Sequence, residues 1–153
     1  MDAIADDVVV AYRGVEPGDL HFILNSWMKS FKPTKKGMRA DMFYAGQQRL
    51  IAALADKSPL IICCDGKPGH SHFIYGWVCG QMNTDANVLT LHYIYVKQGY
   101  RAVGLGKDLL KQIGWKPMCE IHATHWTTVC GALAQRYNVY PNDYPLMIGN
   151  QHV

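Results

Sequence analysis

The stretch GYRAVGLGKDLL, residues 99–110, follows the apolar run LTLHYIYV, residues 89–96, after only two intervening residues. The β-branched and aromatic residues of the run predict a strand, and leucines at helical spacing over 104–113 predict a helix. The glycines between them permit a positive φ and let backbone N–H groups approach a ligand closely. Because the first turn of a helix offers free N–H donors and the positive end of its dipole, this arrangement predicts a phosphate site.

Two common phosphate-binding motifs fail here on particular residues. The nucleotide-binding loop G-x-x-x-x-G-K-[ST] would begin at Gly99, but Leu105 occupies the position of its lysine. The Gly-Lys pair at 106–107 is followed by Asp108, which would repel a phosphate group. The dinucleotide fingerprint G-x-G-x-x-G would require a glycine where Leu109 stands.

The pattern that fits is R-x-x-G-x-G, from Arg101 to Gly106. Its glycines allow main-chain donors to form a cradle for a pyrophosphate, and Arg101 and Lys107 add positive charge. Lys97 or Lys111 would reach a more distant phosphate. The alternative is a glycine-rich turn that only starts a helix.

The composition is typical of one globular domain, which we expect to span residues 1–153. The chain is 49% hydrophobic and 18% charged, and it has no apolar stretch near the roughly 18 residues that cross a bilayer. Its N-terminus carries acids where an export signal carries cations, so we expect a cytoplasmic protein without a membrane partner. The net charge of +3 suits an anionic ligand but is low for a dedicated nucleic-acid binder.

The five cysteines are expected to be buried free thiols. Cys63 and Cys64 lie within PLIICCD, residues 59–65, which is typical of a buried strand. No C-x-x-C pair occurs, and neither HSH (70–72) nor HATH (122–125) comes with a clear third ligand. We therefore expect no metal site.

The periodicity of apolar residues predicts the order of the elements. Helical spacing predicts helices over 17–31, 40–55 and 104–113, and a short helix over 129–137. Apolar and β-branched runs predict strands over 8–12, 59–65, 72–82, 88–96, 118–128 and 144–150. This order predicts an α/β (α+β) domain in which helices cover a mixed sheet.

The segment from Val96 to Gly106 matches the signature V-x-x-x-x-[QR]-x-x-G-x-[GA], and through it the chain resembles the GNAT superfamily of acetyl-CoA-dependent N-acetyltransferases. The resemblance extends to YRGVEPGDLHFIL (12–24), which is similar to the family's opening strand, turn and helix. It also covers the hairpin LIICCDGKPGHSHFIYGWVCGQ (60–81) and the downstream βαβ unit. It implies a mixed, mostly antiparallel sheet.

The resemblance implies that acetyl-CoA is the co-substrate and that a primary amine attacks its thioester directly. The pyrophosphate would lie on amides of the glycine-rich turn, and the pantetheine arm would run along the preceding strand. The residues implied to bind the cofactor are Ile94, Tyr95, Val96, Arg101, Ala102, Val103, Gly104, Leu105, Gly106 and Lys107.

The general base is expected to be His92. Many family members carry a glutamate six residues before the position of Val96, but Thr90 stands there in this chain. His92 is two residues further on, so strand alternation predicts that it shares a face with Thr90 and Ile94. Its ordinary pKa near 6.5 suits a base that acts directly or through a water. A half-buried histidine satisfied by hydrogen bonds is the alternative.

The general acid is expected to be Tyr137, by its match to the tyrosine that the family commonly uses to protonate the leaving thiolate. Tyr140 is its rival, and a tyrosine that only packs is the alternative. Cys130 would carry the acetyl group in a ping-pong route, although a structural thiol is the simpler interpretation. His122 and His125 are expected on one strand, on opposite faces.

The acceptor is expected to be a small-molecule or peptide amine, bound near the first two helices. The aromatic residues there form either pocket walls or core: Trp27, Phe31, Phe43 and Tyr44. A basic loop would favour an acidic acceptor or nucleic acid, or would simply be solvated: Lys32, Lys35, Lys36 and Arg39. A nucleic-acid-associated acyltransferase and a non-catalytic acyl-CoA sensor are the alternative functions, and a homodimer stays open.

Overall fold

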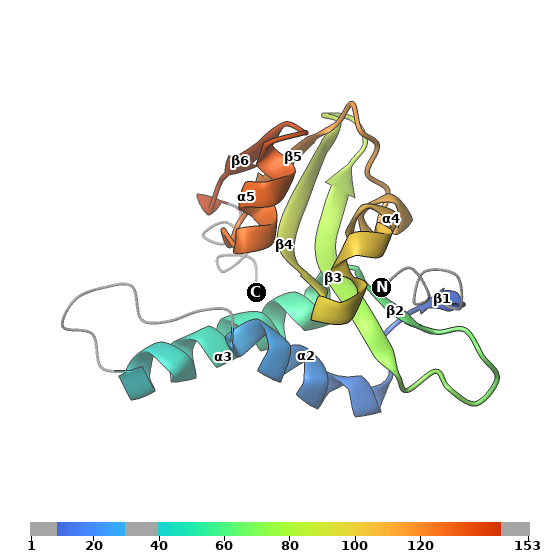
Figure 1. The fold of residues 1–153 in the computed structure, drawn as a ribbon. Coiled ribbons are helices and arrows are strands. Elements are labelled where there is room, and N and C mark those ends of the chain that lie inside the picture. The colour runs from blue at the N-terminus through green and yellow to red at the C-terminus, as the bar shows by residue number, and fades with distance from the viewer. Residues whose placement is uncertain (1–8, 30–39, 145–153) are drawn as a thin grey trace.

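The computed structural model describes residues 9–29 and 40–144, in which six strands form one sheet in chain order (Figure 1). The strands are β1 (Val10–Arg13), β2 (Leu60–Asp65), β3 (Ile74–Asn83), β4 (Val88–Val96), β5 (Glu120–Ala123) and β6 (Val139–Pro141). Neighbours from β1 to β4 are antiparallel, whereas β5 is parallel to both β4 and β6. The predicted mixed, mostly antiparallel sheet is confirmed.

Helices cover both faces of this sheet, and the sheet separates the hydrophobic core into two parts. The helical elements are η1 (Pro17–Asp19), α2 (Leu20–Met28), α3 (Ala40–Lys57), η2 (Gln98–Val103), α4 (Leu105–Gln112) and α5 (Thr128–Ala134). Ile23 and Trp27 of α2 and Ile51 of α3 are fully buried in one core. Leu109 of α4 and Cys130 of α5 belong to the other core, on the opposite face.

Several predicted elements, among them three strands, have different bounds in the structure. The strand expected over 118–128 is only β5, because the Thr127 side chain accepts a hydrogen bond from the Cys130 N–H and so starts α5. The last described strand is β6, whereas the strand expected over 144–150 lies outside the described residues beyond Tyr144. The strand expected over 8–12 is described from Val10, and it continues to Arg13.

Two apolar residues of the predicted helix faces point to solvent. Leu20 is 48% exposed at the start of α2, and Met42 is 65% exposed near the start of α3. The core contacts of these helices come from residues further along each one. Phe31 lies outside the described residues.

Two glycines of β3 bring β3 and β4 together. A Cβ atom at Gly76 would lie 2.5 Å from the backbone oxygen of Tyr95, and one at Gly80 would lie 2.5 Å from that of Thr90. The Gly76 position is also only 3.2 Å from a methyl carbon of Leu109, so α4 packs directly on the strand there. Any side chain at these positions would force the strands or the helix apart.

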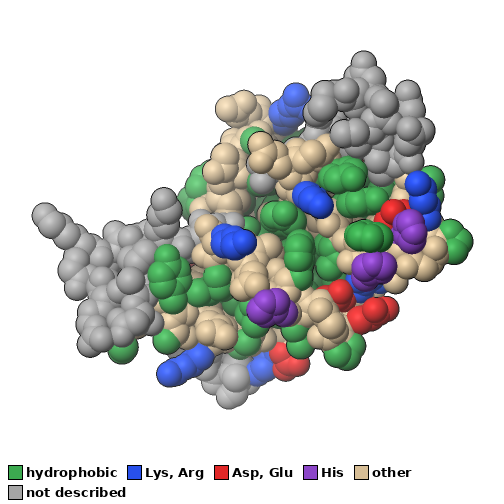
Figure 2. Space-filling view, turned by 60° about the horizontal axis from the view of Figure 1, so that its bottom comes forward, with side chains coloured by type: hydrophobic (Ala, Val, Ile, Leu, Met, Phe, Trp, Pro, Cys, Tyr) green, Lys and Arg blue, Asp and Glu red, His purple; other side chains and the backbone are tan. Residues whose placement is uncertain are grey.

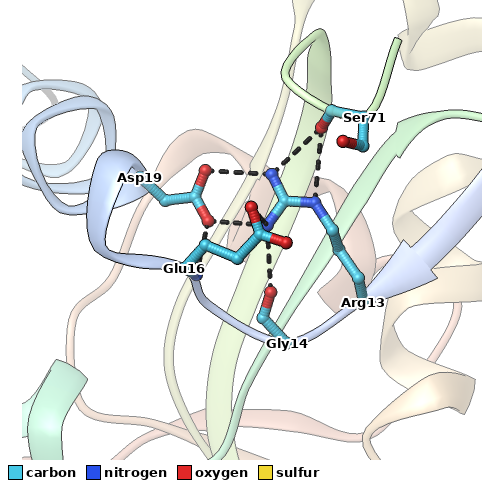
Figure 3. Close-up of polar contacts among 5 residues, drawn as sticks. All are labelled: Arg13, Gly14, Glu16, Asp19 and Ser71. Atoms are coloured by element: carbon cyan, nitrogen blue, oxygen red, sulfur yellow. Dashed lines mark hydrogen bonds and ion pairs between the residues drawn. The ribbon is translucent and has the colours of Figure 1, made fainter. Parts of the chain in front are cut away.

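A partly buried ion pair joins the end of β1 to the start of α2 (Figure 3). Both terminal nitrogens of Arg13 donate to the Asp19 carboxylate, at 2.6 and 2.9 Å. The same guanidinium donates to the backbone oxygen of Ser71, at 3.0 and 3.3 Å, and therefore also holds the β2–β3 connection. Asp19 is only 6% exposed, and the Arg13 hydrogen bonds hold the pKa of its carboxyl below the ordinary value.

We expect Arg13→Met to lower the free energy of unfolding by about 3 kcal/mol, because it leaves the buried Asp19 carboxylate without its cation. Chemical denaturation at pH 7 measures this loss. The pair stabilises the fold above the unfolded carboxyl pKa near 4 and loses its effect as the pH falls through the lower folded value, so the difference from wild type should shrink in acid.

The matched control is Glu16→Gln. The Glu16 side chain is 65% exposed and 4.0 Å from Arg13, so its loss of charge should cost less than about 0.5 kcal/mol. Equal losses in the two variants would contradict a central role for the Arg13–Asp19 pair.

Candidate functional site

A left-handed glycine begins the helix that follows β4. Gly104 has φ 81° and ψ 13°, a conformation that glycine adopts without strain, and α4 starts at the next residue. The first backbone bond of the helix runs from the Asp108 N–H to the Gly104 oxygen, at 3.2 Å. The N–H groups of Leu105, Gly106 and Lys107 precede that bond, in the turn where an α-helix offers no backbone acceptor. Three main-chain donors and the positive dipole end therefore lie together.

The surface above this turn is open. Among the described residues, a Cβ atom at Gly104 would meet nothing within 4 Å, and one at Gly106 would meet a methyl carbon of Val96, at 3.8 Å. Leu105 is buried and anchors the helix start, whereas Lys107 is exposed. This geometry leaves room for an anion at the main-chain donors, and the cofactor site at this turn stays a prediction. The predicted side-chain roles of three further residues lie outside the described features: Arg101, Ala102 and Val103.

An aromatic stack holds the same turn against the sheet. The rings of Tyr75 from β3 and Tyr100 from η2 lie 4.2 Å apart at 23° to each other. Burial, followed by a hydrogen bond to Asp65, raises the pKa of Tyr75 above its ordinary value. The Tyr100 N–H donates to the Lys97 oxygen at 2.8 Å. These contacts fix η2, which leads into the glycine.

β4 contains a bulge at His92. Leu91 pairs with Gly80 and Tyr93 pairs with Cys79, so His92 is an extra residue between two adjacent positions of β3. The bulge resets the alternation of side chains. Tyr93 packs in the core beneath α2 and α3, while Ile94 packs with Leu91 on the other face.

The prediction that Thr90, His92 and Ile94 share one face is therefore wrong for Ile94. Strict alternation places Thr90 on the face opposite Leu91, whereas Ile94 lies in the same core as Leu91. The reason is the bulge, which a period-2 pattern does not reveal.

β4 extends beyond its pairing with β5. Their register runs from Val88 to Leu91 of β4, and the Leu91 oxygen also accepts from the Thr124 N–H at 2.9 Å. The Lys97 N–H donates to the Tyr75 oxygen of β3, so alternation turns the backbone groups of Ile94 and Val96 toward the β5 side. Figure 1 shows α5 beside β4, on the side of the sheet that carries β5 and β6.

His92, Thr124 and His125 form a connected group where β4 and β5 stop pairing. The Thr124 hydroxyl oxygen lies 2.9 Å from Nδ1 of His92 and 3.1 Å from Nδ1 of His125. His92 is 6% exposed and Thr124 is 8% exposed. Burial, followed by the nearby charge of His125, lowers the pKa of His92 to about 4, and burial lowers the pKa of His125 to about 4. Both imidazoles are therefore neutral at pH 7.

Thr124 has no sequence signal that could have identified it. Its contact with His92 spans 32 positions and depends on the β4–β5 register. His125 was expected on a strand with His122, but β5 ends at Ala123 and His125 lies beyond it. His122 instead contacts Glu120 and Asn142.

Trp27 belongs to the core. It is fully buried, stacks on Tyr93 with centroids 5.1 Å apart, and meets the His125 ring edge-on at 5.6 Å. Within the described residues, its indole N–H has no hydrogen-bond partner. Tyr44 is 37% exposed, whereas the side chain of Phe43 lies outside the described features.

The structure does not bring Tyr137 beside His92. The Tyr137 ring packs edge-on against Trp115, with centroids 5.0 Å apart. The next residue, Asn138, accepts a hydrogen bond from the Ile121 N–H, near the start of β5, whereas Thr124 follows the end of that strand. The predicted role of Tyr137 as acid stays a prediction. Its rival Tyr140 is 47% exposed.

The five cysteines are free and buried, as the sequence predicts. Burial raises the pKa of the Cys63 and Cys79 thiols to about 12. The Cys130 thiol lies 3.7 Å from the backbone oxygen of His125, and its contacts are those of a structural thiol.

Positive charge is dispersed over the face toward α2 and α3. On the described part of that face, Lys and Arg side chains stand apart, with hydrophobic side chains between them (Figure 2). The basic residues expected at 32–39 lie outside the described residues. None of the helices in residues 9–29 and 40–144 is both long enough and apolar enough to cross a membrane.

Comparison with known proteins gives one family and several solved structures. The model of the acetyltransferase (GNAT) family matches residues 20–113. No curated protein matches the chain.

Three of the solved structures similar to this chain come from Staphylococcus aureus, Brucella melitensis and Desulfovibrio desulfuricans. An acetyltransferase of the GNAT family from Staphylococcus aureus is 15% identical over 69% of this chain and 63% of its own, with a TM-score of 0.44. A GNAT family acetyltransferase from Brucella melitensis in complex with acetyl-CoA is 15% identical over 68% and 65%, with a TM-score of 0.43. A GNAT-family protein from Desulfovibrio desulfuricans is 18% identical over 69% and 64%, with a TM-score of 0.44. The matches span less than two thirds of each of these chains.

We expect His92→Gln to make stability less dependent on pH. The folded pKa of His92, about 4, is below its unfolded value near 6.5, so the unfolded chain takes up the proton first as the pH falls. Neutral His92 therefore makes its full contribution to the free energy of unfolding above pH 6.5. This contribution, on the order of 3 kcal/mol, is lost as the pH falls toward 4.

Urea denaturation of wild type and His92→Gln at pH 7 and pH 4.5 measures this difference. The variant should lose less stability than wild type between the two values. An identical loss would show that His92 is accessible to protons in the folded state.

Proposed function

The chain belongs to the GNAT family of acetyltransferases, and from that premise we propose that it transfers an acetyl group from acetyl-CoA to a primary amine by direct attack. The observation that carries the proposal is the open turn at Gly104, with three first-turn N–H groups at the end of β4. We propose one N-acetyltransferase domain over residues 1–153. A cytoplasmic location would suit its five free thiols, because that compartment is reducing.

The cofactor would bind across the turn and the strand before it. Backbone N–H groups of Leu105, Gly106 and Lys107 would hold the pyrophosphate, as main-chain donors at a helix N-terminus do for many phosphates. The pantetheine arm would follow the backbone of Ile94 and Val96, which faces the β5 side. A backbone N–H of this strand would stabilise the charge that develops on the thioester oxygen, an interaction often worth a few kcal/mol.

His92 is the proposed base. A lysine-like amine with a pKa near 10.4 is about 3.4 units from neutral at pH 7, which costs roughly 4.6 kcal/mol, whereas an α-amine costs about 1. Once the amine has attacked, its nitrogen is positively charged and far more acidic than the free ammonium ion. A neutral imidazole of low pKa can therefore take this proton, and burial keeps His92 neutral at pH 7.

A non-catalytic acyl-CoA sensor is the second candidate, because Thr90 occupies the position of the family's glutamate. Release of free thiol from acetyl-CoA separates the two functions. The protein should release thiol in the presence of at least one member of a panel of polyamines, amino acids, peptides and DNA. Tight binding of acetyl-CoA without thiol release across the panel would favour the sensor.

The cofactor site is tested at Gly106. Gly106→Glu places a carboxylate in the proposed pyrophosphate site, where like charge should cost about 2 kcal/mol or more, a roughly thirtyfold loss of affinity. The fold should persist, since an acidic residue in the first turn favours the helix dipole and the added Cβ makes only an ordinary contact with Val96.

Gly106→Gln is the control, because it has almost the same shape without the charge. Calorimetric titration with acetyl-CoA should show much weaker binding for Gly106→Glu than for Gly106→Gln. Equal affinities of the two variants would show that the pyrophosphate binds at another site.

Tyr137 is the proposed acid for the departing CoA thiolate. Tyr137→Phe removes only the hydroxyl and keeps the ring against Trp115, so it should lower kcat by about a hundredfold and leave acetyl-CoA affinity unchanged. Tyr140→Phe, at the exposed rival, should keep the wild-type rate. An unchanged kcat in Tyr137→Phe would mean that the proton comes from another group.

A further inference from the structure

The contacts of Thr124 connect two imidazoles that the sequence separates by 32 residues. We propose that Thr124 passes a proton from His92 to His125, so that the base of this enzyme is a relay of two histidines and not His92 alone. The inference rests on the proposed acetyl transfer at the same site. It assigns Thr124 and His125, which have no role in that proposal, to the removal of the proton from the amine.

The hydroxyl of Thr124 has one hydrogen to donate. Three acceptors compete for it: Nδ1 of His92 at 2.9 Å, Nδ1 of His125 at 3.1 Å and the Leu91 oxygen at 3.4 Å. If the hydrogen points to one imidazole, the other must donate its own Nδ1–H, since two lone pairs cannot face each other. If it points to Leu91, both imidazoles must donate. At least one Nδ1 therefore carries a proton.

The arrangement that makes His92 a base is the one in which His92 donates to Thr124 and Thr124 donates to His125. Nδ1 of His92 then holds the proton, and its Nε2 has a free lone pair for the substrate. A hydrogen bond at one ring nitrogen sets the tautomer of an imidazole in this way. Thr124 is buried, so water does not compete for the hydroxyl.

Each proton transfer is balanced along the chain of contacts. The N–H bond of the cationic amine breaks as an N–H bond forms at Nε2 of His92. The Nδ1–H bond of His92 breaks as an O–H bond forms at Thr124, and the original Thr124 O–H bond breaks as an N–H bond forms at Nδ1 of His125. The positive charge leaves the amine and ends on His125, while His92 and Thr124 are neutral again.

His125 lies nearer to solvent than His92. His92 is 6% exposed, whereas His125 is partly exposed, so the charge moves toward water. A hydrogen bond to the backbone of His92 also favours the protonated form of His125.

Aromatic and thiol side chains of the described residues pack near the pair. The Tyr93 hydroxyl donates to the Ser26 oxygen, Trp27 meets His125 edge-on, and the Cys130 thiol lies against the His125 backbone. The charge of His125 lowers the pKa of His92.

The hydrogen-bond pattern is tested by ¹⁵N NMR of the imidazoles, which distinguishes Nδ1–H from Nε2–H tautomers without any turnover. At pH 7 the wild type should show His92 as Nδ1–H and His125 as Nε2–H. Thr124→Val, similar in shape but without a hydroxyl, should lose the Nδ1–H form of His92, while Thr124→Ser should keep it. An Nε2–H tautomer of His92 in the wild type would overturn the relay. An Nδ1–H tautomer that persists in Thr124→Val would overturn it as well.

The transfer itself is tested by kinetics with an amine that wild type accepts. Thr124→Val should lower kcat by about tenfold to a hundredfold, Thr124→Ser should stay within about threefold of wild type, and acetyl-CoA affinity should not change. His125→Asn should lose about as much as Thr124→Val, and the double variant should lose no more, because both interrupt one chain. Thermal melting confirms that each variant is folded.

The outcomes separate the relay from the proposed function. Full kcat in Thr124→Val, or losses that multiply in the double variant, would refute the relay and leave the acetyltransferase intact. A wild type that acetylates no amine would refute the proposed function, and the NMR tautomers would still decide whether the hydrogen-bond chain exists.

Discussion

β4 carries one more residue than β3 between the pairs Leu91–Gly80 and Tyr93–Cys79, and this bulge governs which side chains reach which face. Beyond it, Ile94 and Val96 pack toward α4, while Tyr93 packs beneath α2. The bulge residue is His92, which contacts Thr124 just past the end of β5. Gly80 permits this geometry, because a side chain there would collide with the Thr90 oxygen. The bulge thus sets the position of His92, the end of the β4–β5 pairing and the packing surface for α4.

The candidate site combines two kinds of electrostatic environment. At the start of α4, main-chain donors and the helix dipole make an exposed surface that attracts anions. Around His92, burial removes water and keeps two imidazoles neutral. One strand connects these environments. The bulge of β4 is at His92, the strand ends at Val96, and the turn that leads into α4 follows. The two environments therefore lie at the two ends of one short segment.

The frame around this segment is fixed by contacts from distant parts of the chain. The Arg13–Asp19 pair and the Ser71 oxygen join β1, α2 and the β2–β3 connection. The Tyr75–Tyr100 stack joins β3 to η2. Glycine at position 76 lets α4 approach the strand closely. Packed elements of this kind hold the turn at Gly104 in place.

The sequence alone determined the order of elements as far as α5, the antiparallel meander and the glycine-rich turn. These follow from local signals: apolar periodicity, turn residues and the need for glycine at a positive φ, as at Gly104. Only the tertiary structure decided the face of Ile94, the short β5 and the Thr124 bridge between His92 and His125. A bulge shifts side chains without a pattern of its own, and a contact between strands depends on register. Neither is encoded within a local stretch of residues.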